Sequence, residues 1–313
     1  MQTSCFTVPS DDGPAVDRAE LFVYRWLPWS PPRGVVQIAH GLAEHAGRYA
    51  RLAEALTGAG YAVYANDHRG HGRTARSQEG LGFFAQRNGW ARCVADLRRI
   101  TERIADEYPS LPVVLLGHSM GALLAQDYIA EHGAALAGVV LSGSRGRPPA
   151  MAAMALLAAR LERLRLGRRG RSALLGRLGF GSFNRAFEPA RTHFDWLSRD
   201  PAEVDRYIAD PLCGFAATTQ LWIDLLQGIG RIARAGRLAR IPKGLPILLI
   251  AGTRDPVIGD VKAIERLIAA FRAAGLTHIS HRLYAGARHE VFNETNRSEV
   301  TADVIGWLAE RQR

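Results

Sequence analysis

Cysteine is scarce in this chain. Its 313 residues include only Cys5, Cys93 and Cys213, an odd number spread widely along the sequence. Their spacing matches neither a disulfide framework nor a zinc-binding pattern, so we expect free thiols in a reducing compartment. The sequence therefore predicts no metal site and no organic cofactor.

Long hydrophobic runs are also missing. No stretch of about 18 uncharged apolar residues occurs, so no segment is expected to cross a membrane. The first residues, from Met1 to Asp12, contain neither a basic stretch nor a long apolar one. We therefore expect no signal peptide and a cytoplasmic location.

Lysine is rare beside arginine, and acids are rare where the arginines are densest. The net charge is +10, and one segment contains a single acid, Glu162, among Arg160, Arg163, Arg165, Arg168, Arg169, Arg171 and Arg177. This segment lacks interleaved aromatic residues and any recognised module, so nucleic-acid binding is not expected. Two readings stay open, a solvated arginine-rich face and peripheral contact with an anionic membrane.

An apolar stripe accompanies these arginines. Its members recur at near-helical spacing: Met151, Met154, Leu156, Leu157, Leu161 and Leu164. Stripes of this kind are more often buried core than a membrane-facing surface, so we expect these side chains to be buried.

What the chain does contain is a regular alternation of strand and helix patterns. Apolar residues make up 47% of the sequence, enough for a large core. The alternation predicts an α/β fold with a mostly parallel, doubly wound sheet. It stops between about residues 145 and 235, where long helical patterns predict a helical cap inserted between two core segments, 1–144 and 236–313. The expected strands are Leu21–Trp26, Val35–Ala39, Tyr61–Ala65, Val113–Gly117, Gly138–Ser142, Ile247–Ala251 and Ile279–Leu283.

A serine lies where one of these strands meets a helix. The apolar run Val113–Leu116 leads into Gly117-His118-Ser119-Met120-Gly121, and a helical pattern begins at once. A serine on such a sharp turn has its hydroxyl lifted clear of the sheet, beside the positive end of the helix. Ser119 is therefore the predicted nucleophile.

An acid and a histidine follow in the chain order that this arrangement requires. Asp255 comes just after a buried strand, and His289 lies in the loop after the next one. We expect His289 to take the proton of Ser119 and Asp255 to orient the imidazole. His278 and His281 are weaker rivals because they lie at the start of a strand and within it. Asp260 is a weaker rival acid, since it is better placed to cap the helix that follows.

An oxyanion needs two backbone donors. One is the N–H of Met120, the residue after the nucleophile. The other is expected from the loop after Val35–Ala39, where Gly41 permits a close turn and Leu42 offers its N–H.

These motifs together resemble the monoacylglycerol lipase and lysophospholipase branch of the α/β-hydrolases, a group of serine aminopeptidase-type hydrolases. The matching stretches are His40-Gly-Leu-Ala-Glu44-His45, Arg48-Tyr49, Asp67-His-Arg69-Gly70-His71-Gly72, Gly117-His-Ser119-Met-Gly121, Asp255 and His289. The resemblance covers roughly residues 20–145 and 236–313. It implies the triad Ser119, Asp255 and His289, the oxyanion donors Leu42 and Met120, and an acyl ester of monoacylglycerol or lysophospholipid type as substrate.

Other functions use the same residues. A short-chain carboxylesterase, an aminopeptidase and a cofactor-free perhydrolase all fit this triad, and fold and triad alone do not separate them. A ligand-sensing module with slow turnover is the alternative from another class of protein. Epoxide hydrolysis and dehalogenation need a carboxylate nucleophile, so Ser119 argues against both.

Overall fold

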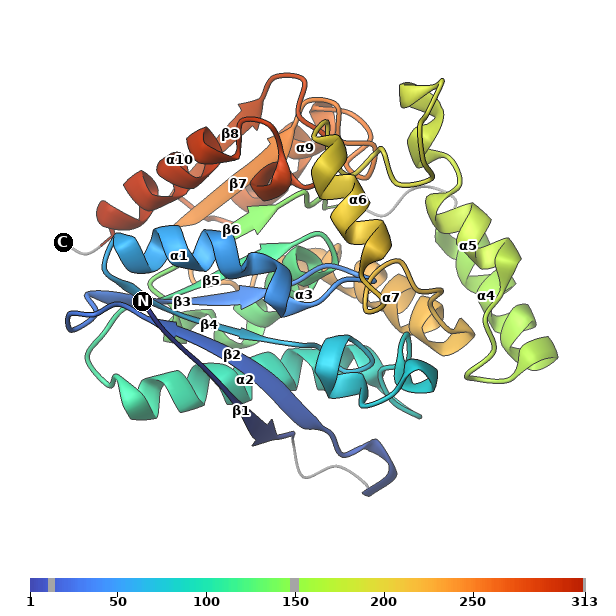
Figure 1. The fold of residues 1–313 in the computed structure, drawn as a ribbon, viewed down its shortest axis with the longest axis horizontal. Helices are drawn as coiled ribbons and strands as arrows, with labels where there is room; N and C mark the ends of the chain where they lie inside the picture. The colour runs from blue at the N-terminus through green and yellow to red at the C-terminus, as the bar shows by residue number, and fades with distance from the viewer. Residues whose placement is uncertain (11–14, 147–151, 312–313) are drawn as a thin grey trace.

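A single mostly parallel sheet runs through the described part of the chain, residues 1–10, 15–146 and 152–311 of the computed structural model (Figure 1). Its eight strands follow the order β1-β2-β4-β3-β5-β6-β7-β8. β1 and β2 are antiparallel to their neighbours, whereas β4, β3 and β5 to β8 pair in parallel. The strands are β1 (Gln2–Pro9), β2 (Glu20–Leu27), β3 (Gly34–Ala39), β4 (Tyr61–Asn66), β5 (Val113–His118), β6 (Gly138–Ser142), β7 (Ile247–Gly252) and β8 (Ile279–Tyr284).

Helices cover both faces of the sheet because successive strand residues point to opposite sides. Leu115 packs into one apolar cluster with residues of α2, α3 and α9, and Leu116 packs into a second cluster with residues of α1 and α10. The bounds of these helices are α1 (Ala50–Gly58), α2 (Gly89–Glu107), α3 (Met120–His132), α9 (Lys262–Ala273) and α10 (Arg297–Ala309). This is the α/β-hydrolase arrangement predicted from the sequence.

The stretch between β6 and β7 is helical, as expected. It contains α4 (Ala152–Leu166), α5 (Ala173–Phe180), α6 (Pro201–Ala209), α7 (Thr219–Ile232) and α8 (Ala235–Leu238). In Figure 1, α4, α5 and α6 lie beyond the carboxyl ends of the parallel strands. α7 packs against α2 and α3 and joins the same apolar cluster, so the last part of this stretch belongs to the core packing.

The sequence-based expectation that the apolar stripe of α4 is buried was wrong. Met154, Leu157, Leu161 and Leu164 are exposed, Leu164 by 80%. Leu156 alone among the described members is packed against the core, and Met151 lies outside the described residues. The helix has one neighbouring layer, formed by α7 and α5, so only its inner face is covered. The periodicity identified a helix but not how many of its sides are packed.

The expected strands all occur, each within one residue of its expected bounds. β1 was missed because half of its residues are polar and its inward positions are only half-buried. Within the described residues, no helix is both long enough and apolar enough to span a bilayer.

Candidate active site

Ser119 occupies a strained turn between β5 and α3. Its backbone has φ 52° and ψ −117°, in the left-handed half of conformational space that serine rarely adopts. The Ser119 N–H donates to the Ser142 carbonyl at 2.9 Å, which ties the turn to β6. A Cβ at Gly117 would lie 2.5 Å from the Gly121 carbonyl oxygen, and one at Gly121 would overlap the Ala39 carbonyl. The two glycines are therefore required for the turn to fit between strand and helix.

Asp255 and His289 form a buried pair at the same edge of the sheet. The Nδ1 atom of His289 lies 2.8 Å from Oδ2 of Asp255, and both side chains are buried. The other carboxylate oxygen of Asp255 accepts the Val257 N–H at 2.8 Å, which fixes the orientation of the carboxylate. With Nδ1 bonded to the acid, Nε2 of His289 is left for a second partner.

The rival residues have other positions. His278 and His281 are exposed, the first just before β8 and the second in its middle. The Asp260 side chain accepts the Lys262 N–H at 3.0 Å from the position before Val261, which is the N-cap residue of α9.

Electrostatics favour a basic imidazole at His289. Burial alone would lower the pKa of His289, but the charge of Asp255 and its hydrogen bond outweigh burial and raise the pKa above the ordinary value of 6.5. The ring of His118 lies 4.7 Å from that of His289, centroid to centroid. Burial, followed by the charge of His289, lowers the pKa of His118 to about 4, so His118 is neutral at pH 7. His289 is therefore the basic histidine of this pair.

The loop after β3 packs directly against Ser119. A Cβ at Gly41 would lie 3.3 Å from the Ser119 Cβ, and the Gly41 N–H donates to Glu44 Oε1 at 2.5 Å. Arg48 donates to Glu44 and Glu290, each at 2.7 Å. Burial would raise the pKa of Glu290, but the charge of Arg48 dominates and lowers that pKa to about 2. The loop that carries Leu42 is thus held against Ser119 by a buried network of charges.

His68 and His71, in the loop after β4, pack against His40 at the end of β3. The His68 N–H donates to Nε2 of His40 at 2.9 Å, and the His71 ring packs 5.2 Å from His40. Burial lowers the pKa of His68 to about 3 and that of His71 to about 4. The three neutral rings fill the space beneath the loop that begins at Gly41.

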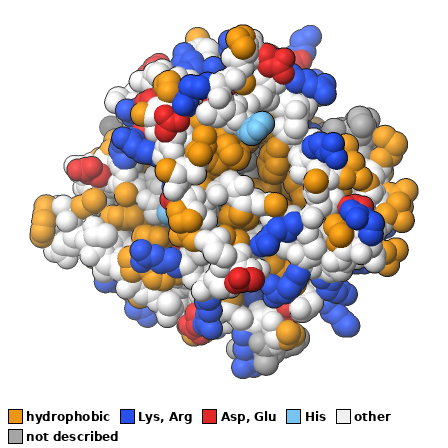
Figure 2. Space-filling model, turned by 45° about the vertical axis from the view of Figure 1, so that its right-hand side comes forward, with side chains coloured by type: hydrophobic (Ala, Val, Ile, Leu, Met, Phe, Trp, Pro, Cys, Tyr) orange, Lys and Arg blue, Asp and Glu red, His pale blue; other side chains and the backbone are white. Residues whose placement is uncertain are grey.

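An aromatic cluster of the helical stretch reaches His289 through Trp196. The Trp196 ring lies 5.3 Å from the His289 ring, and the Phe183 ring lies 4.9 Å from Trp196. Phe180 lies between Trp196 and Trp222, at 6.2 and 5.5 Å. Figure 2 shows hydrophobic side chains gathered in a hollow on the side of the molecule where α4, α5 and α6 lie in Figure 1, with cationic side chains around it. Phe180 and Phe183 could not be found from the sequence, because no motif marks an aromatic residue of a helical segment as a neighbour of the site.

Comparisons with known proteins agree with this architecture. A family model described as serine aminopeptidase, S33, matches residues 30–296. The chain is 33% identical to a monoacylglycerol lipase of Mycolicibacterium smegmatis over 90% of both chains. It is 27% identical to a probable lysophospholipase L2 of Haemophilus influenzae, over 87% of this chain and 82% of that one. A solved carboxyl esterase of Bacillus coagulans superposes with a TM-score of 0.90 at 28% identity, covering all of both chains. The chain therefore belongs to the serine aminopeptidase S33 family, in the monoacylglycerol lipase-like branch of the α/β-hydrolases.

Proposed function

We propose that this protein hydrolyses monoacylglycerols or lysophospholipids with Ser119 as nucleophile, His289 as base and Asp255 as the orienting acid. The family and the relatives identify the chain as a carboxylic ester hydrolase. The observation that carries the triad is the buried 2.8 Å contact between His289 and Asp255, at the sheet edge where Ser119 lies on its strained turn.

The proposed chemistry has two halves. His289 Nε2 accepts the hydroxyl proton as Ser119 attacks the ester carbonyl, and the N–H groups of Leu42 and Met120 stabilise the oxyanion. The imidazolium then gives its proton to the departing alcohol, leaving an acyl-enzyme. Water, deprotonated by His289, releases the fatty acid in the second half.

The surroundings of His289 support a substrate with an apolar acyl chain. The cluster of Trp196, Phe183 and Phe180 offers apolar surface beside His289 for such a chain. An ester with a long acyl chain suits this surface better than a short, uniformly polar one.

Hydrolysis of a graded ester series tests the proposal. Rates would be measured on p-nitrophenyl esters from about two to sixteen carbons, with 2-monoacylglycerol and lysophosphatidylcholine alongside. We expect a preference for long chains and a loss of at least about 10⁴-fold in Ser119→Ala. The variant Ser10→Ala, which changes a buried serine far from the site, is the control.

Other outcomes would redirect the assignment. Cleavage of short esters only would favour a carboxylesterase. Inert esters together with reaction of Ser119 with a fluorophosphonate would favour the aminopeptidase or the sensing module. Full activity in Ser119→Ala would refute the proposed nucleophile.

We also propose that the exposed face of α4 contacts an anionic membrane surface. Leu157, Leu161 and Leu164 are exposed on this helix, and Leu174 and Leu178 are exposed on the adjacent α5. Apolar side chains flanked by arginines are typical of helices that lie in the interface plane. Some of these arginines also bind the protein itself: Arg168 donates to the Gln86 carbonyl and Arg171 to the Leu81 carbonyl. The apolar side chains therefore carry more of this proposal than the charge does.

Vesicle co-sedimentation tests the membrane contact. The double variant Leu161→Glu/Leu164→Glu should lose most binding to vesicles that contain phosphatidylglycerol. Trp29→Glu is the matched control, because Trp29 is 78% exposed and lies at the connection between β2 and β3, away from α4. Equal binding by both variants would contradict the proposal.

A further inference from the structure

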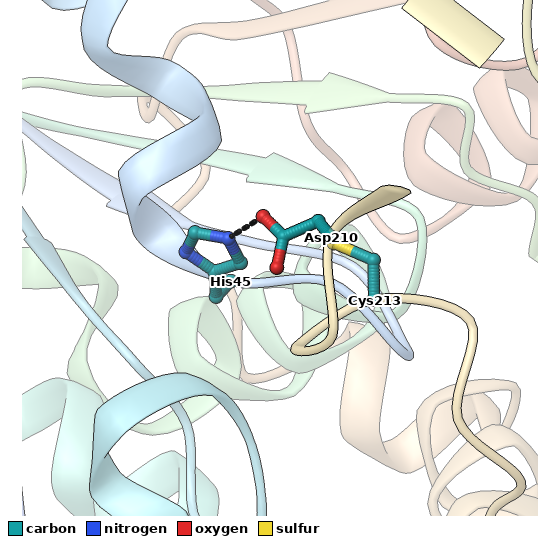
Figure 3. A group of neighbouring side chains, drawn as sticks. All are labelled: His45, Asp210 and Cys213. Carbon is teal, nitrogen blue, oxygen red and sulfur yellow. Dashed lines mark hydrogen bonds and ion pairs between the residues drawn. The ribbon is translucent and has the colours of Figure 1, made fainter. Parts of the chain in front are cut away.

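Three potential metal ligands meet where the helical stretch contacts the core. His45 lies in the loop after β3, whereas Asp210 and Cys213 lie just after α6 (Figure 3). Nε2 of His45 is 2.9 Å from Oδ2 of Asp210, and one ligand atom from each of the three residues lies within 4.8 Å of the other two. None of the three belongs to the proposed triad.

The local backbone presents Asp210 and Cys213 together. They are separated by two residues, and the Cys213 N–H donates to the Asp210 carbonyl at 3.0 Å, which closes a tight turn. Two-residue separations on tight turns are typical of ligand pairs in zinc sites. Figure 3 shows the His45 imidazole directed at the Asp210 carboxylate, with the Cys213 side chain beside it.

The turn and the loop are already held together by other bonds. The Gly214 N–H donates to the Ala43 carbonyl at 2.9 Å, and the Tyr207 hydroxyl donates to the same carbonyl at 2.8 Å. The ligands are therefore preorganised by the fold. Donor atoms of a tetrahedral zinc site are about 3.3–3.7 Å apart. His45 Nε2 and Asp210 Oδ2 would have to open from 2.9 Å by about 0.5 Å, and separations as long as 4.8 Å would have to close by about 1 Å. Rotation of the partly exposed Asp210 and Cys213 side chains allows both movements.

The surrounding charge favours a cation. Arg48 forms ion pairs with both Glu44 and Glu290, so the two negative charges of these carboxylates exceed its single positive charge. Asp210 adds a further negative charge beside His45. Its side chain is 30% exposed, which leaves an entry path for an ion from solvent.

We propose that His45, Asp210 and Cys213 bind one zinc-type divalent cation that fastens the helical stretch to the loop carrying Leu42. A thiolate, an imidazole and a carboxylate form a donor set that zinc accepts and that magnesium and calcium disfavour. Cys213 loses its thiol proton to solvent on binding, the three residues supply three ligands, and water completes the tetrahedron.

Cobalt is the sharpest probe of this site. Titration of the full chain with Co²⁺ alone should produce a sulfur-to-cobalt charge-transfer band in the near ultraviolet, saturating at one ion per chain. Zn²⁺ should displace the band. Cys213→Ser should abolish it, whereas Cys5→Ser, which changes the exposed thiol far from the site, should leave it intact.

A second variant keeps the proposal falsifiable if Cys213→Ser folds poorly. Asp210→Asn retains the side-chain shape and should weaken Zn²⁺ binding, measured by equilibrium dialysis, by at least about tenfold. Zn²⁺ should also raise the melting temperature of the unaltered chain and slow alkylation of Cys213 but not of Cys5. A cobalt band that survives Cys213→Ser, or zinc affinity unchanged in Asp210→Asn, would overturn the proposal.

Discussion

At the scale of single residues, His289 links burial to the proposed chemistry. A buried histidine normally has a low pKa, because its charged form loses hydration. Asp255 reverses this effect, since its carboxylate stabilises the imidazolium at 2.8 Å. The same stabilisation is what the proposed mechanism needs when His289 takes the proton of Ser119.

The raised pKa of His289 predicts an acid limit to activity. Protonated imidazole cannot accept the serine proton, so kcat/KM should fall as pH drops through the pKa of the free enzyme. Because that pKa lies above 6.5, kcat/KM should fall to half of its maximum at a pH that is still above 6.5. A kcat/KM profile between pH 5 and 9 checks this. A midpoint well below 6.5 would mean that Asp255 does not act on His289 as described.

Gly143 tests how closely His289 must be placed. It has φ +59°, and an added Cβ would lie 2.9 Å from His289 Cε1 and 3.3 Å from Asp255 Oδ2. Gly143→Ala should therefore displace the imidazole and lower kcat by about 10²-fold, the usual effect of a displacement of about 1 Å.

Gly259→Ala is the matched control for backbone strain. Gly259 has φ +80°, but nothing lies within 4 Å of an added Cβ. This variant should lose some stability and keep its activity. If both variants lost activity equally, strain and not displacement of His289 would be the cause.

At the scale of elements, α7 is the helix that joins the inserted stretch to the core. Its N-cap, Thr218, accepts the Leu221 N–H at 3.2 Å and donates to the Gly82 carbonyl at 2.5 Å. The turn after α4 is bonded to the start of α7 as well, because the Thr219 N–H donates to the Gly170 carbonyl at 2.8 Å. The arginine- and glycine-rich stretch 167–171 is thus a turn fastened to the start of α7.

Thr218→Ala should destabilise the protein by about 1–2 kcal/mol, because the helix loses its side-chain cap and the Gly82 carbonyl keeps only the Thr218 N–H of its two donors. Thr218→Ser keeps the hydroxyl and should retain most of the stability. Urea unfolding of both variants measures the difference. Equal midpoints for Thr218→Ala and the unaltered protein would show that the cap contributes little.

At the scale of the whole molecule, one buried ion pair connects distant parts of the chain. Arg69, in the loop after β4, donates to both carboxylate oxygens of Asp96 in α2, at 2.6 and 2.9 Å. It also donates to the Asp17 carbonyl in the connection between β1 and β2. The side chains of Arg69 and Asp96 are 1% exposed, so water cannot replace a lost partner.

Asp96→Ala should destabilise the fold by about 3–5 kcal/mol, because it removes the two hydrogen bonds between the Asp96 carboxylate and the buried Arg69 charge. Glu102→Ala is the control. Glu102 pairs with Arg98 on the exposed face of the same helix, and its removal should change stability very little. Chemical denaturation measures both. A small loss in Asp96→Ala would mean that Arg69 finds another partner.

The sequence by itself determined where the strands other than β1 lie along the chain and which residues follow their carboxyl ends. Ser119, Asp255 and His289 each directly follow a strand or lie in the loop after one, so parallel pairing alone predicts a shared edge. Gly117 and Gly121 were also predictable, since the tight turn leaves no room for a Cβ. These features can be predicted because they depend on local sequence patterns and on the general rule that functional residues follow the carboxyl ends of parallel strands.

Only the tertiary structure decided which surfaces are covered and which distant residues meet. The helix period of Leu157, Leu161 and Leu164 is the same whether a second layer covers them or not, and here none does. Phe183 reaches the surroundings of His289 through Trp196, and no motif announces this. His45 and Asp210 are 165 positions apart and meet only when the inserted stretch docks on the core. Such contacts depend on three-dimensional packing, for which a linear pattern contains no local signal.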